Sequence, residues 1–183
     1  VATKGDPHRG EKVYRRASLQ CIVCHAIGGS GGIIGPDMVS IGASAPVDYL
    51  IESLLEPSKK IKEGYHTTLV TMKNGDTFAG AVAGEDNNEL GIRDAAGNEN
   101  RLAKAQLKSQ QMSPISLMPP GLTLQLREDE FIDMVRFLSE LGKEGEFKTT
   151  ATPYIRKWQL LNPHDRTRDD IGHYGKKIFA EAD

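Results

Sequence analysis

The segment SLQCIVCHAIGG, residues 18–29, contains the only two cysteines of this 183-residue chain, Cys21 and Cys24, and His25 follows the second directly. Two cysteines placed at random lie three apart, with a histidine next to them, only about three times in ten thousand. The spacing therefore predicts that the three side chains act together.

Three kinds of site compete for this spacing. A structural zinc site needs four cysteine or histidine ligands, but the chain has no second cysteine pair and His66, His164 and His173 are scattered. A thioredoxin-like redox pair belongs at a strand-to-helix turn and leaves the histidine without a role. Covalent haem attachment uses all three residues, since the thiols form thioethers with the vinyl groups and the imidazole binds iron. The motif favours one covalently bound c-type haem, with His25 as proximal ligand.

Three amphipathic helices are expected around this motif. Each has a capping or stop signal and an apolar face at helical spacing. The first, capped by Asp6 and begun by Pro7, presents Gly10, Val13 and Tyr14; the second, capped by Ser44 with Pro46 in its first turn, presents Val47, Leu50, Ile51 and Leu54; the third, stopped by Gly142, presents Phe131, Met134, Val135, Leu138 and Leu141.

A block rich in turn signals separates the second helix from the third. Asn74-Gly75 indicates a hairpin, and further turns are expected near residues 85–88 and 96–97. The expected strands cover residues 65–72, 77–83, 89–94, 99–103 and 108–112. Five short strands predict an antiparallel β-meander or a small SH3-like barrel.

The chain is therefore expected to be α+β and to have three parts. Residues 1–64 and 113–142 would form a discontinuous helical domain, residues 65–112 an inserted β subdomain, and residues 143–183 a C-terminal extension. The extension is expected to be a linker to another domain or an anchor through Ile155, Trp158 and Leu161, against the domain itself or at the interface of a homodimer. The histidines His164 and His173 are expected to be solvated.

The motifs between the helices resemble those of the class I c-type cytochromes. In that all-α family a Gly-x-x-x-aromatic pattern on the first helix, matched by Gly10 and Tyr14, crosses the last helix, here expected near Phe131 and Val135. A Gly-Pro pair follows the haem motif, matched by Gly35 and Pro36. The resemblance implies that the Pro36 carbonyl accepts a hydrogen bond from the proximal histidine and orients its ring.

The distal ligand of the family is a methionine before the last helix, and SLMPPGL places Met118 there. A methionine is more often a packing residue than a ligand, and Met72, Met134 and Met38 are expected to pack. Met112 and His66 remain the competitors. His25 and Met118 are 93 residues apart, and without the 48 residues of the β block they would be 45 apart. That spacing is ordinary for the family, so the β block is interpreted as an insertion.

The combination resembles a narrower group, the Pirellula/Verrucomicrobium-type haem-binding domain. The resemblance runs from about Gly5 to Gly142 and includes CHAIGG, SIGASAPVDYLIESLLEPSKKIKEGYHT, NGDTFAG, GIRDAAG and SLMPPGL. In this group the module commonly lies toward the C-terminal side of large secreted proteins. The resemblance therefore implies that other domains of a larger polypeptide are among the partners.

An iron held by His25 and Met118 has no open position, which predicts an electron-transfer protein rather than an enzyme. A labile methionine would instead favour a haem peroxidase or gas sensor, and a third interpretation makes the β block a docking platform.

The expected partners are redox proteins in transient contact. With 23 basic against 25 acidic residues, no nucleic-acid surface is indicated. No apolar run could span a membrane, Val1 suggests a mature or excised chain, and thioether attachment implies the periplasm or another exported location.

Overall fold

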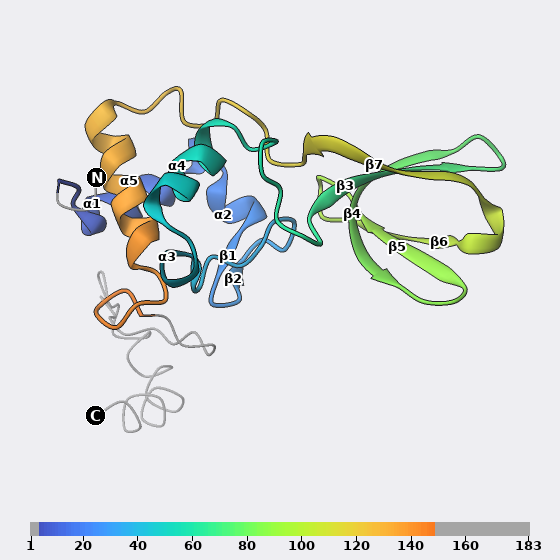
Figure 1. Cartoon of the computed structure of the whole chain (residues 1–183), viewed down its shortest axis with the longest axis horizontal. Coiled ribbons are helices and arrows are strands. Elements are labelled where there is room, and N and C mark those ends of the chain that lie inside the picture. The colour runs from blue at the N-terminus through green and yellow to red at the C-terminus, as the bar shows by residue number, and fades with distance from the viewer. Residues whose placement is uncertain (1–3, 149–183) are drawn as a thin grey trace, which may run out of the picture. The chain divides into compact units, whose positions relative to one another are not determined.

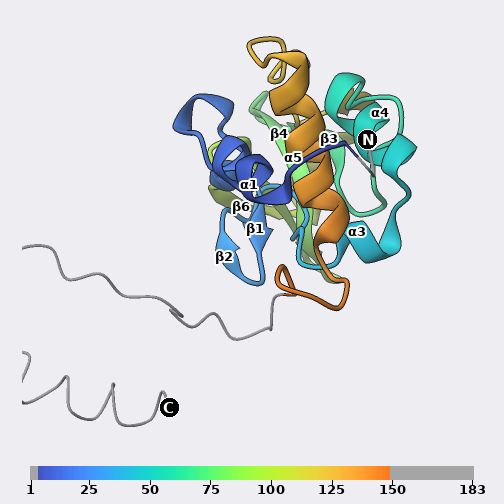
Figure 2. The same cartoon turned by 90° about the vertical axis from the view of Figure 1, so that its left-hand side faces the viewer.

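A computed structural model describes residues 4–148 of the chain, and Figures 1 and 2 show it from two directions. Helices and strands both contribute, so the chain is an α+β protein, as expected. The chain divides into a unit of residues 1–153 and a unit of residues 154–183. The anchor residues Ile155, Trp158 and Leu161 and the histidines His164 and His173 lie outside the described residues.

The first and last helices pack against each other. α1 (Pro7–Tyr14) begins where expected, because the Asp6 carboxylate accepts hydrogen bonds from the backbone N–H groups of His8 and Arg9, at 2.9 and 3.2 Å. α5 (Glu128–Glu140) has three acidic residues in its first turn, where they stabilise the positive end of the helix dipole. Both views show α1 beside α5 (Figures 1 and 2).

Gly10 lies at the closest approach of these two helices. A Cβ atom at this position would be 1.9 Å from the Asp133 carbonyl oxygen and 2.9 Å from Phe137 Cβ. The absence of a side chain is therefore required for the contact. The crossing lies at Asp133 and Phe137 rather than at Phe131 and Val135, because residues 133 and 137 share the helix face that meets Gly10.

A nearly buried carboxylate joins the same two helices. Asp133 accepts hydrogen bonds from Arg9 Nε at 2.7 Å, from Arg9 Nη2 at 3.2 Å and from the Asp6 backbone N–H at 2.7 Å. Its side chain is only 4% exposed. The Arg9 hydrogen bonds hold the pKa of Asp133 below its ordinary value, against the opposing effect of burial.

We expect the Asp133→Asn variant to lower the free energy of unfolding at neutral pH by about 1–3 kcal/mol, because a buried hydrogen-bonding partner of Arg9 is weakened. A carboxyl whose folded pKa is lowered stabilises the fold above its unfolded pKa, and this contribution disappears as pH falls through the folded pKa. Urea unfolding at pH 7 and pH 3 should therefore show a smaller pH effect for the variant. Asp129→Asn is the control, since Asp129 is 63% exposed. Equal losses in both variants would contradict the assignment.

Several short elements lie between α1 and the sheet. They are η1 (Ala17–Leu19), α2 (Cys21–Cys24), β1 (Ala26–Ile27), β2 (Ser30–Gly31), α3 (Ile41–Ser44) and α4 (Val47–Leu55). The prediction that Ser44 caps the second helix is wrong, because Ser44 ends α3 and Pro46 is the N-cap of α4. A residue before proline avoids the helical conformation, and Ala45 is accordingly extended. Of the predicted apolar face of α4, only Leu50 is fully buried.

Five antiparallel strands form one sheet. They are β3 (His66–Met72), β4 (Thr77–Glu85), β5 (Glu89–Arg93), β6 (Glu99–Ala103) and β7 (Leu107–Ser116), with η2 (Lys104–Gln106) before the last. The order is β6-β5-β4-β3-β7, so the first four strands form the expected meander and β7 returns to pair with β3. β6 and β7 are the two edges, and their pairing, which a closed barrel would require, is not among those of residues 4–148. β7 also extends four residues beyond the expected end.

The helices and the sheet have separate hydrophobic cores. The helical core is formed by Val13, Tyr14, Leu19, Ile27, Leu50, Met134, Phe137, Leu138 and Leu141. The sheet core is formed by Val70, Leu90, Ile92 and Leu102. Phe147, in the first part of the extension, packs against the helical core, with its ring centroid 5.6 Å from that of Phe137. The strands of the sheet therefore bury their own apolar side chains.

The helices of the described region are short. α5, with 13 residues, is the longest, and none between residues 4 and 148 has the length and apolar character needed to cross a membrane.

Candidate cofactor site

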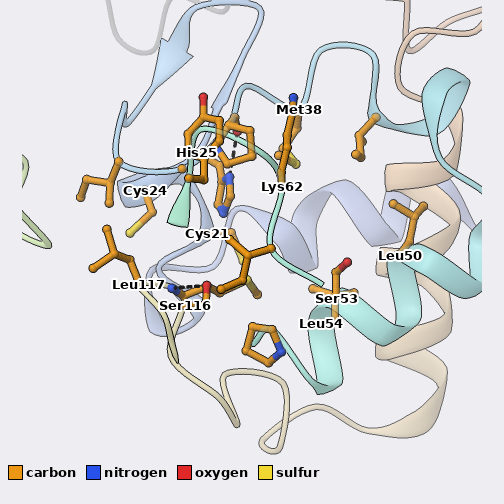
Figure 3. Close-up of a pocket in the computed structure, with 18 of the residues that line it drawn as sticks. Cys21, Cys24, His25, Met38, Leu50, Ser53, Leu54, Lys62, Ser116 and Leu117 are labelled. Carbon is orange, nitrogen blue, oxygen red and sulfur yellow. Dashed lines mark hydrogen bonds between the residues drawn. The ribbon is translucent and has the colours of Figure 1, made fainter. Parts of the chain in front are cut away.

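A cavity of about 310 Å³ lies among α2, α4 and the segments that lead into and out of the sheet. Its volume is at the lower end of the roughly 300–1,000 Å³ typical of sites for small molecules. Cys21, Cys24 and His25 line it together with Ser116 and Leu117 (Figure 3). The motif and the segment before α5, far apart in sequence, therefore share one cavity.

Both cysteines come from the single turn of α2. Three residues apart in a helix, their side chains project from the same face, and both line the cavity. Gln20, directly before this turn, has a φ of 56°, which residues other than glycine rarely adopt. Burial raises the pKa of both thiols, so they remain protonated at neutral pH. This argues against a reactive disulfide-exchange pair, whose thiolate must be stabilised.

His25 is oriented by the hydrogen bond that was expected. Its Nδ1 lies 2.8 Å from the Pro36 carbonyl oxygen. A carbonyl only accepts hydrogen bonds, so Nδ1 carries the proton and Nε2 keeps a free electron pair. Burial lowers the pKa of His25, although the bond to Pro36 acts in the opposite direction. The ring is thus neutral near pH 7, the form that binds metals.

Gly35 allows the chain to pass close to this imidazole. A Cβ atom at Gly35 would lie 2.4 Å from His25 Cε1, 2.6 Å from Nδ1 and 2.9 Å from Nε2. Any larger residue would displace the ring or the loop. The Gly-Pro pair therefore has two roles, since Gly35 leaves room for the ring and the Pro36 carbonyl accepts a hydrogen bond from it.

Asp37, which the sequence analysis did not single out, holds the loop after the motif. Its Oδ1 accepts from the N–H groups of Gly28 (2.9 Å) and Val39 (2.8 Å), and its Oδ2 accepts from Gly29 (2.7 Å). Burial raises the pKa of Asp37, but the three backbone bonds outweigh it and the pKa is lowered. An aspartate within a glycine-rich loop is the sequence signal that could have identified it.

Tyr14 lines the cavity and is 3% exposed. Its buried hydroxyl has no hydrogen-bond partner among the described residues. Burial raises the pKa of this phenol, so it stays protonated at neutral pH. A buried unpaired donor is unfavourable, and this hydroxyl is therefore a polar group that the described residues leave unsatisfied.

The methionines separate into three groups. Met118 and Met38 line the cavity, whereas Met112 is 70% exposed on β7. Neither Met112 nor His66 is among the described residues of the cavity wall. Met134 is fully buried and Met72 packs on the sheet core, as expected.

Met118 and Met38 enter the cavity on different segments. Met38 follows two residues after Pro36, and in Figure 3 it lies on the same side as His25. Met118 follows Ser116 and Leu117, which lie on the other side in that view. The Met118 N–H donates to Ser116 Oγ at 3.1 Å. Met118 therefore reaches the cavity on a segment separate from the one that carries His25 and Met38.

Among residues 4–148, no group of three or more His, Cys, Asp and Glu side chains converges as a metal site. A scan of protein-family models finds no match to this chain, and a search of curated proteins finds none either.

Proposed function

We propose that the protein is a monohaem c-type cytochrome that carries single electrons between redox partners. The observation that carries this proposal is the convergence of both thiols and the Nε2 electron pair of His25 on one cavity. The residues fit a covalently bound haem, since they supply two anchors on one helical turn and a histidine of fixed tautomer. The packing of α1 on α5 at Gly10 supports a class I cytochrome fold with the sheet as an insertion.

Cys21 and Cys24 would attach the cofactor. Each thiol would add across one vinyl double bond, forming a carbon–sulfur bond while the thiol hydrogen goes to the neighbouring vinyl carbon, with no electron gained or lost. Both sulfurs belong to one helical turn that is followed directly by His25, so the two anchors and the imidazole would hold the cofactor together.

His25 and Met118 would hold the iron. When bound, the haem iron would supply the one-electron couple. The hydrogen bond from Nδ1 to Pro36 increases the basicity of the imidazole and prevents its rotation. A thioether from Met118 would favour the reduced iron and raise the potential. If both residues hold the iron, no position remains for a substrate, which supports electron transfer over catalysis.

This chemistry also indicates the partners and the location of the protein. Partners would dock transiently through a small interface, as in other weak redox encounters. Thioether formation places the protein in the periplasm or another exported location. Other domains of a larger polypeptide are the proposed electron donors or acceptors.

The proposal is tested by replacing the distal ligand. We expect Met118→Ala to abolish the far-red charge-transfer band of the oxidised protein and to allow carbon monoxide to bind the reduced protein, which the unaltered chain should not do. Met112→Ala is the matched control, since Met112 lies in β7, six residues before Met118, and is 70% exposed. A pyridine haemochrome measurement on the unaltered chain should report two thioethers. A folded chain that takes up no haem during expression with a functional maturation system would refute the proposal.

A further inference from the structure

The turn between β5 and β6 lies against the wall of the cavity. Ala95 in this turn lines the cavity, and the Cβ position of Gly97 is 3.9 Å from Ile34 Cγ1. Ile34 itself lines the cavity from the loop after the cysteine motif. The inserted sheet therefore contributes directly to the site, although its hydrophobic core is separate from that of the helices.

Arg93, the last residue of β5, connects this turn to that loop. Its Nη1 donates a hydrogen bond to the Ile33 carbonyl oxygen at 3.2 Å. Its Nη2 lies 3.6 Å from the carboxylate of Glu99, its partner across the β5–β6 ladder. The side chain is only 24% exposed. Glu99 of the same hairpin thus contacts one side of the guanidinium, and the Ile33 carbonyl of the loop binds the other. The rigid, planar set of donors of an arginine is suited to contacting two groups at once.

The residue that Arg93 binds is close to the groups that orient His25. Ile33 precedes Gly35 by two residues and Pro36 by three. Gly35 packs against the imidazole, and the Pro36 carbonyl accepts the hydrogen bond from its Nδ1–H. A shift of the Ile33 carbonyl would therefore be transmitted through three peptide units to the Pro36 carbonyl.

We propose that Arg93 is a positioning residue, which fixes the turn of residues 94–98 over the cavity and the loop of residues 33–36 beside His25. The inserted sheet then serves as a wall that limits access of water and small ligands to the cofactor. This inference rests on the proposed function for the identity of the cofactor. The contact between Arg93 and the loop can be tested whether or not a cofactor is bound.

The test compares Arg93→Ala and Arg93→Lys with Arg101→Ala, all in the full chain. Arg101 is the matched control, because it belongs to the same hairpin, is 72% exposed and lies 3.8 and 3.9 Å from its nearest carboxylates. The first readout is the rate at which imidazole binds the oxidised protein. Loss of a charge-assisted hydrogen bond should raise this rate roughly tenfold in Arg93→Ala, with partial recovery in Arg93→Lys and no change in Arg101→Ala.

The second readout is the reduction potential. Greater access of water favours the more highly charged oxidised iron, so we expect a lower potential in Arg93→Ala only. A merely structural role would lower the unfolding midpoint without moving the potential or the ligand-binding rate of the folded protein. Identical rates and potentials in Arg93→Ala and Arg101→Ala would overturn the inference.

The third readout is amide hydrogen exchange, measured with and without haem. Arg93→Ala should speed amide exchange in residues 33–35 while the strands of the sheet remain protected, and Arg101→Ala should not. Absence of haem in the unaltered chain would refute the proposed function, yet faster exchange at the loop would still support the Arg93 contact. Unchanged exchange at the loop in Arg93→Ala would refute the contact itself.

Discussion

Replacement of both Cys21 and Cys24 by alanine is expected to remove covalently bound haem completely. Each single variant should keep one thioether, because the other thiol still lines the cavity. Haem staining after denaturing electrophoresis reports the covalent bond, and the pyridine haemochrome spectrum distinguishes one thioether from two. The expected series is two thioethers, one and none, which is the largest functional change that any substitution in this chain should cause.

Val23→Ala is the matched control for this series. Val23 lies between the two cysteines in α2, is 58% exposed and should leave attachment unchanged. Loss of haem in Val23→Ala to the same extent would show that the short helix, rather than the thiols, is responsible. Covalent haem in the double cysteine variant would contradict the proposed attachment.

Gly10→Ala is expected to cause the largest loss of stability. The new methyl group would lie 1.9 Å from the Asp133 carbonyl oxygen, a backbone atom that cannot rotate away. Overpacking usually destabilises by about 1–3 kcal/mol and sometimes by more, and we expect a loss of at least about 3 kcal/mol here. Because domains of this size are stable by only about 5–15 kcal/mol, thermal or urea unfolding should show the change readily.

Gly84→Ala is the control for the helix crossing. Gly84 lies in β4, and a Cβ atom there would have no neighbour within 4 Å. Its φ is not in the left-handed region, so the substitution should leave stability nearly unchanged. Equal losses in the two variants would indicate that the contact of α1 with α5 is not the reason for the effect of Gly10→Ala.

Elements with local signals were predicted well. The cap and proline at Asp6-Pro7 located the start of α1, and Asn74-Gly75 located the hairpin between β3 and β4, with Gly75 at a φ of 98°. These signals act within a few residues, since a cap binds the first turn and a left-handed glycine reverses the chain. The start of α4 was missed because the restriction imposed by Pro46 on Ala45 outweighs the capping preference of Ser44.

Features that depend on distant pairing could not be predicted in the same way. The return of β7 to β3 joins residues about 40 apart, and no local pattern specifies which edge a last strand will choose. The contribution of Asp37, the unpaired hydroxyl of Tyr14 and the bond from Arg93 to Ile33 likewise appear only when the loops are folded. These contacts depend on where separate segments meet.

The sequence by itself determined the α+β class of fold and predicts the kind of chemistry. The spacing of Cys21, Cys24 and His25 is fixed by their positions along the chain. The helical or alternating periodicity of apolar residues is likewise a pattern of neighbouring residues, and it indicates helices and strands. The tertiary structure decided which distant groups join the site. It brings Met118 rather than Met112 to the cavity, adds Ala95 of the sheet to the cavity wall, and joins Arg93 to the Ile33 carbonyl. Which distant residues become neighbours depends on packing and strand pairing over the whole fold. A pattern of neighbouring residues in the sequence does not specify these contacts.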